Sequence, residues 1–482
     1  MNYRMILQVV GRVLLIEALL LILPLAVALI YGEPLLPLII PMLIAAVLGW
    51  LLRSIPVVKT DIGSTEGFTI VGLSWIVMSL VGAFPFVLSG AIPNYIDAVF
   101  ETVSGFTTTG ASIMTNVEIL NKSCAFWRLF THWVGGMGVL VFIMVVLPMS
   151  GDHYMYIMRA EVPGPVVGKL VPRARKTAEI LYLLYIALTL LEVFFLLCGG
   201  MSFYDALVHS FATAGTGGFS IRAASIGYYN STYIDIVIGS FMLLFSINFN
   251  LYYLLLIGEA RQAVRSEELR VFAGIVAFSV LSIAWNITRL YGSFSGALRY
   301  SYFQVASVIS TTGFSTADFN QWPQYSRILL VVLMFIGACA GSTGGGLKVS
   351  RVIILLKSIP AEVQLLVRPH SVNKIWLEGK SLSRDTVKSV QIYFYLYMLI
   401  IAVSALLVSF DNLDGETSFT GVIACISNIG PGLSLVGPAG NYSVFSSVSK
   451  IVLIFDMLLG RLEIYPILYL FIPYVWRRGK HA

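Results

Sequence analysis

Long apolar runs constrain the fold of this chain more than any local motif does. Ten stretches are apolar over about 20 residues, the length that an α-helix needs to cross the hydrocarbon core of a bilayer. They lie near residues 10–30, 35–52, 68–90, 126–149, 180–200, 234–257, 271–290, 328–356, 389–410 and 448–475. The run from residue 67 to residue 96 carries no charge at all. The sequence therefore predicts an all-α polytopic membrane protein.

Composition excludes the main alternatives. Charged residues make up 12% of the 482 residues and apolar residues make up 57%, whereas a soluble domain carries about 25% charged residues. Disorder is excluded too, because it requires low hydrophobicity and high net charge. The formal charge of +6 resides in short loops between apolar runs, which argues against a nucleic-acid partner and for contact with membrane lipid. The four cysteines have no metal-ligand spacing, so we expect no metal site built on them.

The distribution of Lys and Arg predicts the orientation, because cytoplasmic loops carry an excess of both residues. With the N-terminus inside, the outer side receives only scattered positive residues such as Lys122, Arg222, Arg299 and Arg327. The inner side receives Arg4, Arg53, Lys59, Arg159, Lys169, Arg173, Arg175, Lys176, Arg261, Arg265, Arg270, Arg368, Lys374, Lys380, Arg384, Lys388, Arg477, Arg478 and Lys480. An even number of spans then places both termini in the cytoplasm.

Four shorter amphipathic segments alternate with the long runs. They lie near residues 94–112, 203–220, 300–316 and 416–434, and each ends in glycines and small polar residues. Each segment is too short to span a bilayer, so we interpret each as a re-entrant helix followed by a loop. With both termini inside, all four segments enter the membrane from the outer side.

These segments are copies of one another. Without any gap, residues 97–112 align with residues 205–220. The corresponding glycines of the four copies are Gly110, Gly218, Gly313 and Gly430, at intervals of 108, 95 and 117 residues. Gly217 is an alternative to Gly218, because Thr216-Gly217 repeats Thr109-Gly110; the ungapped alignment favours Gly218. A repeat at this scale predicts four equivalent units around one axis.

Four such loops on an axis would present backbone carbonyl groups to a pore. Glycine allows the backbone angles that aim successive carbonyls inward, and rings of carbonyls can replace the hydration shell of a cation. The partly negative C-terminal ends of the re-entrant helices favour a cation at the same point. A tight turn or a close helix contact would explain one loop alone, but four loops in register favour a filter. The candidate filter residues are Thr108, Thr109, Gly110, Thr216, Gly217, Gly218, Thr311, Thr312, Gly313, Asn428, Ile429 and Gly430.

A run of glycines interrupts the apolar stretch 328–356. Three consecutive glycines, residues 344–346, would break a helix in mid-membrane, where irregular backbone is tolerated only if it is buried or lines a cavity. The run superficially resembles a nucleotide-binding loop, but Leu347 separates Gly346 from Lys348 and Val349 follows, so we expect no nucleotide on this chain. Close helix packing is the alternative role of these glycines.

A charged residue, Arg461, stands near the middle of the last apolar stretch, where it normally faces a cavity or a partner. Arg461 and Glu463 are two residues apart and do not share a helix face, so they cannot neutralise each other locally. An electrostatic barrier in the pore and a structural ion pair both remain open. The candidate gate residues are Gly341, Gly344, Gly345, Gly346, Lys348 and Arg461.

Five further polar residues have simpler interpretations. Glu192 lies in mid-span, so we expect it to be the partner of a buried donor on another helix and not a transport site. His132 and His209 each stand alone in the sequence, so we expect packing or surface residues and not metal ligands. Asp97 and Asp205 open two re-entrant helices, where a negative charge suits the helix N-terminus and predicts a capping role over direct ion binding.

Six motifs resemble those of the Trk/Ktr/HKT superfamily of potassium transporters, and specifically its TrkH-like membrane subunits. They are TTTGAS at 107–112, TGGFS at 216–220, STTGFST at 310–316, GSTGGGLKVSR at 341–351, NIGPGLS at 428–434 and GRLEI at 460–464. The resemblance covers nearly the whole chain. It implies four M1–pore helix–M2 repeats around one central pore plus an N-terminal helix pair. The expected units are residues 1–60 for the pair and residues 61–165, 166–262, 263–375 and 376–482 for repeats 1 to 4.

The resemblance also implies how the parts act. The four loops would coordinate potassium, the glycine run would be an intramembrane gate below them, and Arg461 would face the pore. Plant relatives that admit sodium often carry Ser at the first filter position, so Gly110 favours potassium. The fourth loop, Asn-Ile-Gly at residues 428–430, departs from Thr-Thr-Gly and weakens fourfold symmetry in the filter.

Partners and location follow from the same resemblance. It implies a homodimer in the cell inner membrane and a cytosolic ring of nucleotide-binding regulatory subunits (RCK-type, TrkA-like). The basic loops at residues 159–176 and 368–388 are candidate docking sites for this ring.

We therefore predict a potassium uptake protein, not an enzyme, with potassium as its transported and bound ligand. The alternative within the same fold is a sodium-permeable or cation-coupled potassium symporter. A membrane enzyme is disfavoured because the sequence has no paired catalytic carboxylates at a membrane face, no His-rich cluster and no nucleophile motif. The potassium-binding subunit of a pump complex is disfavoured by the ten-span layout.

Overall fold

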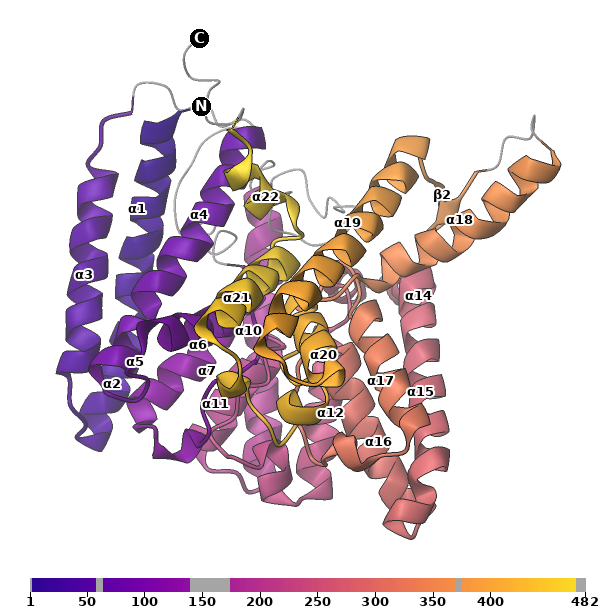
Figure 1. The fold of residues 1–482 in the computed structure, drawn as a ribbon, viewed down its shortest axis with the longest axis horizontal. Coiled ribbons are helices and arrows are strands. Elements are labelled where there is room, and N and C mark those ends of the chain that lie inside the picture. Colours follow the sequence, from indigo (N-terminus) through magenta and orange to yellow (C-terminus); the bar gives the residue numbers. More distant parts are fainter. Residues whose placement is uncertain (1, 58–63, 139–173, 369–373, 474–482) are drawn as a thin grey trace.

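The structure is a computed structural model that describes residues 2–57, 64–138, 174–368 and 374–473 (Figure 1). The described part is mainly helical, with almost no strand. Its one sheet is a short antiparallel hairpin of β1 (Trp376–Leu377) and β2 (Lys380–Ser381), in which Trp376 pairs with Ser381. The predicted all-α polytopic fold is thus confirmed.

The N-terminal part contains α1 (Tyr3–Leu20), α2 (Ile22–Tyr31) and α3 (Leu36–Arg53), at the left of Figure 1. α1 packs along α3 at two glycines. A Cβ atom on Gly11 would lie 2.8 Å from the carbonyl oxygen of Gly49, and a Cβ on Gly49 would lie 2.8 Å from that of Gly11. Only the absence of both side chains lets the two backbones approach this closely, as small residues do in membrane helices.

The remaining elements follow in chain order. Residues 64–138 contain four helices: α4 (Ser64–Gly82), α5 (Phe84–Leu88), α6 (Tyr95–Phe106) and α7 (Lys122–Gly136). Then come α10 (Ala174–Cys198), α11 (Phe203–Ala214), α12 (Thr232–Phe245), α13 (Phe249–Leu256), α14 (Ala260–Val264), α15 (Glu267–Tyr291), α16 (Phe294–Ile309), α17 (Gln324–Ile336) and α18 (Val349–Val367). After the hairpin come α19 (Arg384–Val408), α20 (Gly415–Ile426), α21 (Ser447–Arg461) and α22 (Tyr465–Phe471). Short 3₁₀ turns are η1 (Val117–Ile119), η2 (Ser225–Tyr229), η3 (Phe319–Gln321), η4 (Ser409–Asp411), η5 (Ser434–Val436) and η6 (Tyr442–Val444).

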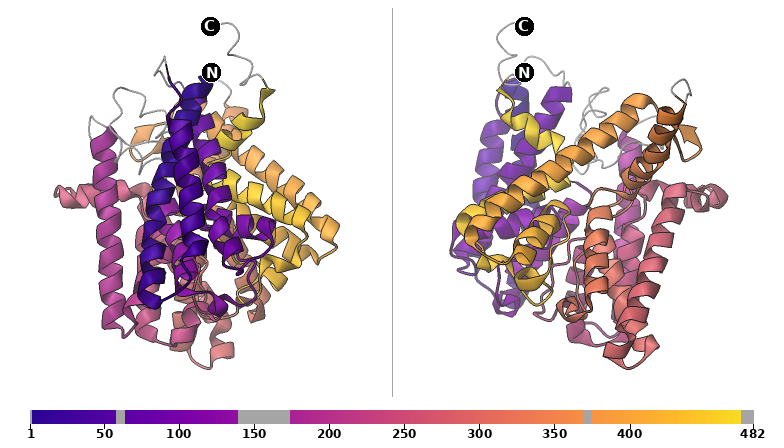
Figure 2. Two further views of the ribbon diagram at one scale, coloured as in Figure 1. Left: turned by 90° about the vertical axis from the view of Figure 1, so that its left-hand side faces the viewer. Right: turned by 45° about the vertical axis from the view of Figure 1, so that its right-hand side comes forward.

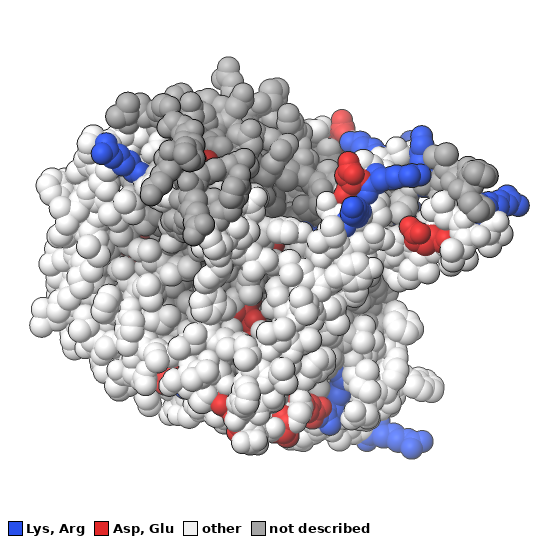
Figure 3. All heavy atoms as spheres, turned by 45° about the horizontal axis from the view of Figure 1, so that its top comes forward, with Lys and Arg blue, Asp and Glu red and all other residues white. Residues whose placement is uncertain are grey.

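Six described helical segments are long and apolar enough to cross a membrane, or up to seven if a bent pair counts as one span. The six are Tyr3–Tyr31, Leu36–Arg53, Thr65–Leu88, Glu179–Cys198, Glu267–Tyr291 and Arg384–Asp411. On the face that Figure 3 shows, charged side chains gather near the projecting end and along the lower edge, and the surface between them is nearly uncharged. The chain is therefore a multi-pass membrane protein.

Three predicted spans are broken helices. The stretch 234–257 bends by 92° between α12 and α13, the stretch 328–356 separates into α17 and α18, and the stretch 448–475 separates into α21 and α22. The last break has two residues at positive φ, Glu463 at 54° and Ile464 at 68°, which end α21. The bend after α12 is bonded to another part of the chain: Ser246 accepts a hydrogen bond from Cys339 N, and Phe249 N donates to Gly341 O.

Some predictions fall on residues outside the described part. The stretch 126–149 is described only as far as residue 138, and α7 ends within it at Gly136. Lys59, Arg159, Lys169, Arg173 and the C-terminal basic residues are not described, nor are residues 369–373 of one basic loop.

Four short helices form a closed circuit of contacts. α6, α11, α16 and α20 correspond to the four predicted re-entrant helices. Each packs against a helix that follows a different short helix in the chain: α6 against α21, α11 against α7, α16 against α12 and α20 against α17. The circuit is closed because α21, which follows the fourth short helix, packs against α6, the first one. Figure 2 shows the fold from two further sides, with the N-terminal helices in indigo and the C-terminal helices in yellow. The boundaries of the four predicted repeats stay a prediction.

Candidate ion pathway

The loops after the four short helices have the same backbone conformation. One residue has a positive φ in each, and a glycine two residues later has another. The first residues are Thr108 (55°), Thr216 (54°), Thr311 (59°) and Asn428 (55°). The glycines are Gly110 (80°), Gly218 (74°), Gly313 (87°) and Gly430 (91°). Positive φ is uncommon for any residue other than glycine, so its recurrence at four matched places marks a single repeated structure. The angles also match the ungapped alignment, with Gly218 corresponding to Gly110.

Each loop is anchored to its own helix by the same hydrogen bond. The residue between the two positive-φ positions donates its N–H to the carbonyl five residues earlier. The four bonds run from Thr109 to Ser104 at 2.9 Å, from Gly217 to Ala212 at 2.8 Å, from Thr312 to Ser307 at 2.9 Å and from Ile429 to Ala424 at 2.9 Å. In each loop this bond fixes the N–H side of one residue. The carbonyl oxygen of the same residue approaches a glycine of a neighbouring loop.

Those four carbonyls alternate with the four glycines in one ring. A Cβ on Gly110 would lie 1.9 Å from Gly217 O, and one on Gly218 would lie 1.9 Å from Thr312 O. A Cβ on Gly313 would lie 2.0 Å from Ile429 O, and one on Gly430 would lie 2.7 Å from Thr109 O. Each glycine therefore touches the next loop in chain order, and the fourth touches the first. All four glycines also line one hollow of about 150 Å³ beside the ring.

A buried ion pair that we did not predict supports the first loop. Arg128 Nε lies 2.6 Å from Glu101 Oε1, and both side chains are almost fully buried. The Glu101 carboxylate also accepts hydrogen bonds from Ser112 Oγ and Ile113 N, each at 2.9 Å. Arg128 Nη1 donates to Ser220 O at 3.1 Å, which links the first loop region to the second. An arginine inside the predicted apolar stretch 126–149 was the sequence signal for this partner.

The two histidines support the second loop. His132 Nδ1 lies 2.8 Å from Gly105 O, and its Nε2 lies 3.3 Å from Phe219 N. His209 Nε2 lies 3.0 Å from Ser220 Oγ. Both side chains are buried, as expected of packing residues. Among the described residues, no group of three or more His, Cys, Asp or Glu side chains could hold a metal ion.

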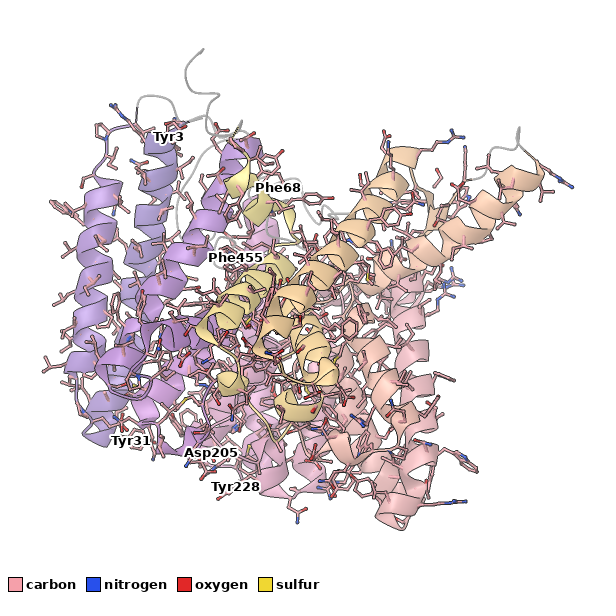
Figure 4. All side chains as sticks on the ribbon, viewed as in Figure 1. Tyr3, Tyr31, Phe68, Asp205, Tyr228 and Phe455 are labelled. Atoms are coloured by element: carbon pink, nitrogen blue, oxygen red, sulfur yellow. The ribbon has the colours of Figure 1, made fainter. Side chains whose placement is uncertain are left out.

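Asp97 and Asp205 lie in the first turns of α6 and α11, one turn inside the side-chain caps, which are Asn94 and Ser202. Each makes a contact with another element instead. Asp97 pairs with Lys450 of α21 at 2.7 Å, and Asp205 pairs with Arg222 at 3.1 Å. Figure 4 labels Asp205 at the end of the molecule opposite Tyr3. Burial raises the pKa of Asp205, but hydrogen bonds from Tyr229 and Arg222 outweigh it, so the pKa lies below its usual value.

The glycine run forms an irregular loop between α17 and α18, and this intramembrane loop contacts two of the four ring loops. Gly345 N donates to Thr311 Oγ1 at 2.6 Å. A Cβ on Gly344 would lie 2.8 Å from Ser310 O, and a Cβ on Gly345 would lie 2.4 Å from Ser427 O. Lys348 is buried, and its Nζ donates to Gly344 O within the same loop. The intramembrane loop thus lies directly against the third and fourth ring loops.

Arg461 ends α21 and reaches both the intramembrane loop and the first ring loop. Its Nη1 donates to Thr343 O at 2.7 Å and to Thr108 Oγ1 at 3.3 Å. Its Nη2 donates to Gly136 O at 2.7 Å and to Gly135 O at the end of α7. The guanidinium therefore lies among backbone carbonyls just inside the ring.

The acidic residues near Arg461 have other partners. Glu463 forms an ion pair with Arg351 of α18, which agrees with the expectation that Arg461 and Glu463 do not neutralise each other. Asp456 Oδ1 accepts a hydrogen bond from Ser404 Oγ at 2.7 Å. Glu192 is fully buried in α10, and neither carboxylate oxygen has a hydrogen-bond partner that meets ordinary distance and angle criteria. Thr213 of the neighbouring helix α11 is the donor next to Glu192, at a geometry outside those criteria.

Asn428 was predicted for its backbone only, yet its side chain joins three elements. Its Nδ2 donates to Thr109 Oγ1 and to Met457 O, each at 2.9 Å. It thus connects the fourth ring loop to the first and to α21. The side-chain amide of asparagine has two donor hydrogens, whereas the threonine hydroxyl has one. Asparagine at this position of the fourth loop can therefore bind both partners at once.

Comparisons with known proteins agree with this architecture. A family model described as TrkH, cation transport protein, matches residues 38–477. The Trk system potassium uptake protein TrkH of Escherichia coli (strain K12) is 38% identical over 489 residues, covering 99% of this chain and 100% of that protein. The protein of the same name from Halomonas elongata is 35% identical over 488 residues, with 99% and 100% covered.

A solved structure has the same fold. The crystal structure of the potassium transporter TrkH from Vibrio parahaemolyticus matches with a TM-score of 0.88 and 32% sequence identity, covering 99% of this chain and 100% of that one. Proteins of this family are transport proteins and not enzymes. Two whole-length relatives above 30% identity, the family model and the shared fold agree with the resemblance seen in the motifs, and the chain belongs to the TrkH family of cation transport proteins.

Proposed function

We propose that this protein takes up potassium ions through a central pore, with the four-loop ring as its selectivity filter. The observation that carries the proposal is the ring itself, in which four anchored carbonyls alternate with four positive-φ glycines beside one hollow. Carbonyl groups held in this way can replace the hydration shell of a cation without reorganising. The relatives named as potassium uptake proteins support potassium as the ion.

The intramembrane loop is the proposed gate. It fills the space just inside the third and fourth ring loops, and Arg461 adds a positive charge beside it. A hydrated ion could pass inward only after the loop moves. Lys348 and the glycines at 341 and 344–346 belong to this gate, Lys348 through its bond to Gly344 O.

We propose the rest of the assembly on the family resemblance and on the name "Trk system" of the relatives. The protein would lie in the inner membrane as a homodimer with both termini in the cytoplasm. A cytosolic ring of nucleotide-binding subunits would control the gate.

Growth at low potassium tests the function directly. A bacterial strain without potassium uptake should grow when it expresses this protein together with its cognate regulator. The variant Gly110→Ser should rescue growth poorly at equal membrane expression. Failure of the parent to rescue would refute potassium uptake. Sodium or proton influx that is coupled to potassium entry in vesicles would instead identify the symporter.

A further inference from the structure

One acidic side chain holds both ends of the intramembrane loop. Glu268, in the first turn of α15, is buried. Its Oε1 accepts a hydrogen bond from Ala340 N at 2.8 Å, on the α17 side of the loop. The same oxygen accepts another from Ser350 N at 3.0 Å, in the first turn of α18. One carboxylate oxygen thus closes the base of a loop whose tip contacts the filter.

The position of Glu268 is itself fixed from the hairpin β1–β2. Glu378 Oε1, in the turn of that hairpin, accepts hydrogen bonds from Ser266 Oγ at 2.8 Å and from Glu268 N at 3.0 Å. Glu378 and Gly379 have φ values of 51° and 71°, the mirror-image turn that suits a two-residue hairpin. Glutamate is a costly choice at such a position. The turn therefore presents a carboxylate to the positive N-terminal end of α15.

A neighbouring ion pair lies at the same corner but does not reach the intramembrane loop. Lys357 of α18 donates to Trp376 O at 2.7 Å and forms an ion pair with Glu267. Glu267 is next to Glu268 in sequence, but its carboxylate binds Lys357 of α18 and not the intramembrane loop. The hairpin, the start of α15 and α18 lie at the same end of the molecule (Figure 1). Glu267 is thus a natural control for Glu268.

We infer that Glu268 is the positioning residue that holds the intramembrane loop closed beneath the filter, and that Glu378 seats it from the hairpin. This inference rests on the proposed function, because it assumes that the loop obstructs ion passage. The Glu268 carboxylate offers an acceptor to two backbone N–H groups in a buried place, where a lost acceptor is expensive. Without it, the closed position of the loop loses stability relative to any position in which water reaches those N–H groups.

Single-channel recording in planar bilayers tests the inference on the purified full-length protein. Glu268→Ala should raise the open probability about tenfold, since two hydrogen bonds to a charged group are lost in the closed state only. Glu268→Gln keeps an acceptor oxygen and should stay close to the parent. Glu267→Ala should match the parent. The potassium-to-sodium permeability ratio should be unchanged in all variants, because no filter contact is altered.

Glu378→Ala keeps the test decisive if Glu268→Ala does not fold. Glu378 is exposed, and its loss should raise the open probability in the same direction by a smaller factor. An open probability equal to or below that of the parent in both folded Ala variants would overturn the inference, and so would a Gln variant as open as the Ala variant. A parent that conducts no potassium would refute the proposed function, whereas a conducting parent with unresponsive variants would refute only the role of Glu268.

Discussion

Substituting the ring glycines one at a time gives a graded test of the filter. A Cβ on Gly110 or Gly218 would lie 1.9 Å from a carbonyl oxygen of the next loop, whereas a Cβ on Gly430 would lie 2.7 Å from one. Real Cβ atoms essentially never approach closer than 3.0 Å. The neighbouring carbonyl must therefore retreat by about 1.1 Å in the first two cases and by about 0.3 Å in the last. All three positions also have positive φ, which costs a residue with a side chain about 1–2 kcal/mol.

The expected result follows from these displacements. Gly110→Ser and Gly218→Ser should move a carbonyl out of the ring and reduce the potassium-to-sodium permeability ratio at least about tenfold, the equivalent of ~1.4 kcal/mol. Gly430→Ser bears the same backbone cost but a smaller clash, so its ratio should fall less. Gly274→Ala, on α15 with no atom within 4 Å of the new Cβ, is the control.

Reversal potentials of the purified protein, measured under bi-ionic conditions, report the ratio without depending on expression. A ratio unchanged in Gly110→Ser would refute the assignment of the ring as the filter. A Gly430→Ser variant as unselective as Gly110→Ser would refute the argument from carbonyl displacement while leaving the ring in place.

Three further predictions concern other parts of the pathway. Arg461→Ala should raise potassium flux, because a charge about 6 Å from a passing ion at an effective dielectric of about 20 repels it by about 3 kcal/mol. Arg461→Lys should keep low flux, and an equal single-channel current in parent and Ala variant would place the barrier elsewhere. Arg128→Ala should lower stability by about 3–5 kcal/mol by leaving Glu101 buried without its partner, and the thermal unfolding of the detergent-purified protein should recover in part when Glu101→Gln is added. The folded-state pKa of Asp205 is lowered, so its contribution to stability is present above the unfolded value of about 3.9 and is lost as pH falls through the folded value; acid unfolding curves of Asp205→Asn should lack this component, and identical curves would contradict it.

The sequence was most informative where a pattern repeated. Four copies of one loop, compared with each other, indicated the positive-φ glycines and their equivalence, because each copy served as a control for the next. Hydropathy located six stretches that are spanning helices among the described residues, but not the breaks in the stretches 234–257, 328–356 and 448–475. The bend after Phe245 has no glycine or proline at the break. It depends on hydrogen bonds with the intramembrane loop about 90 residues later, in which Cys339 N donates to the bend and Gly341 O accepts from it.

Contacts made through backbone atoms were the least predictable. Arg461 is held by the carbonyls of Thr343 and Gly136, and Glu268 binds two N–H groups. No residue type marks such partners, since every residue carries them. Glu268 also lies at the start of a span among other charged residues. Acidic side chains are common at a helix N-terminus, so the sequence did not distinguish Glu268 from its neighbours.

The proposed filter and the proposed gate share hydroxyl groups, which makes them energetically dependent on each other. Thr311 Oγ1 accepts a hydrogen bond from Gly345 N, and Thr108 Oγ1 accepts one from Arg461. Both threonines hold the costly positive φ that turns the ring loops, so these bonds help to offset that cost. When the intramembrane loop leaves, the freed hydroxyls lose their donors in a buried place, and water or a cation must take over. An ion entering the inner end of the filter would supply that replacement. Occupancy of the filter by the transported ion should therefore favour the open loop, and raising its concentration should lengthen the open times of the parent more than those of Thr311→Val.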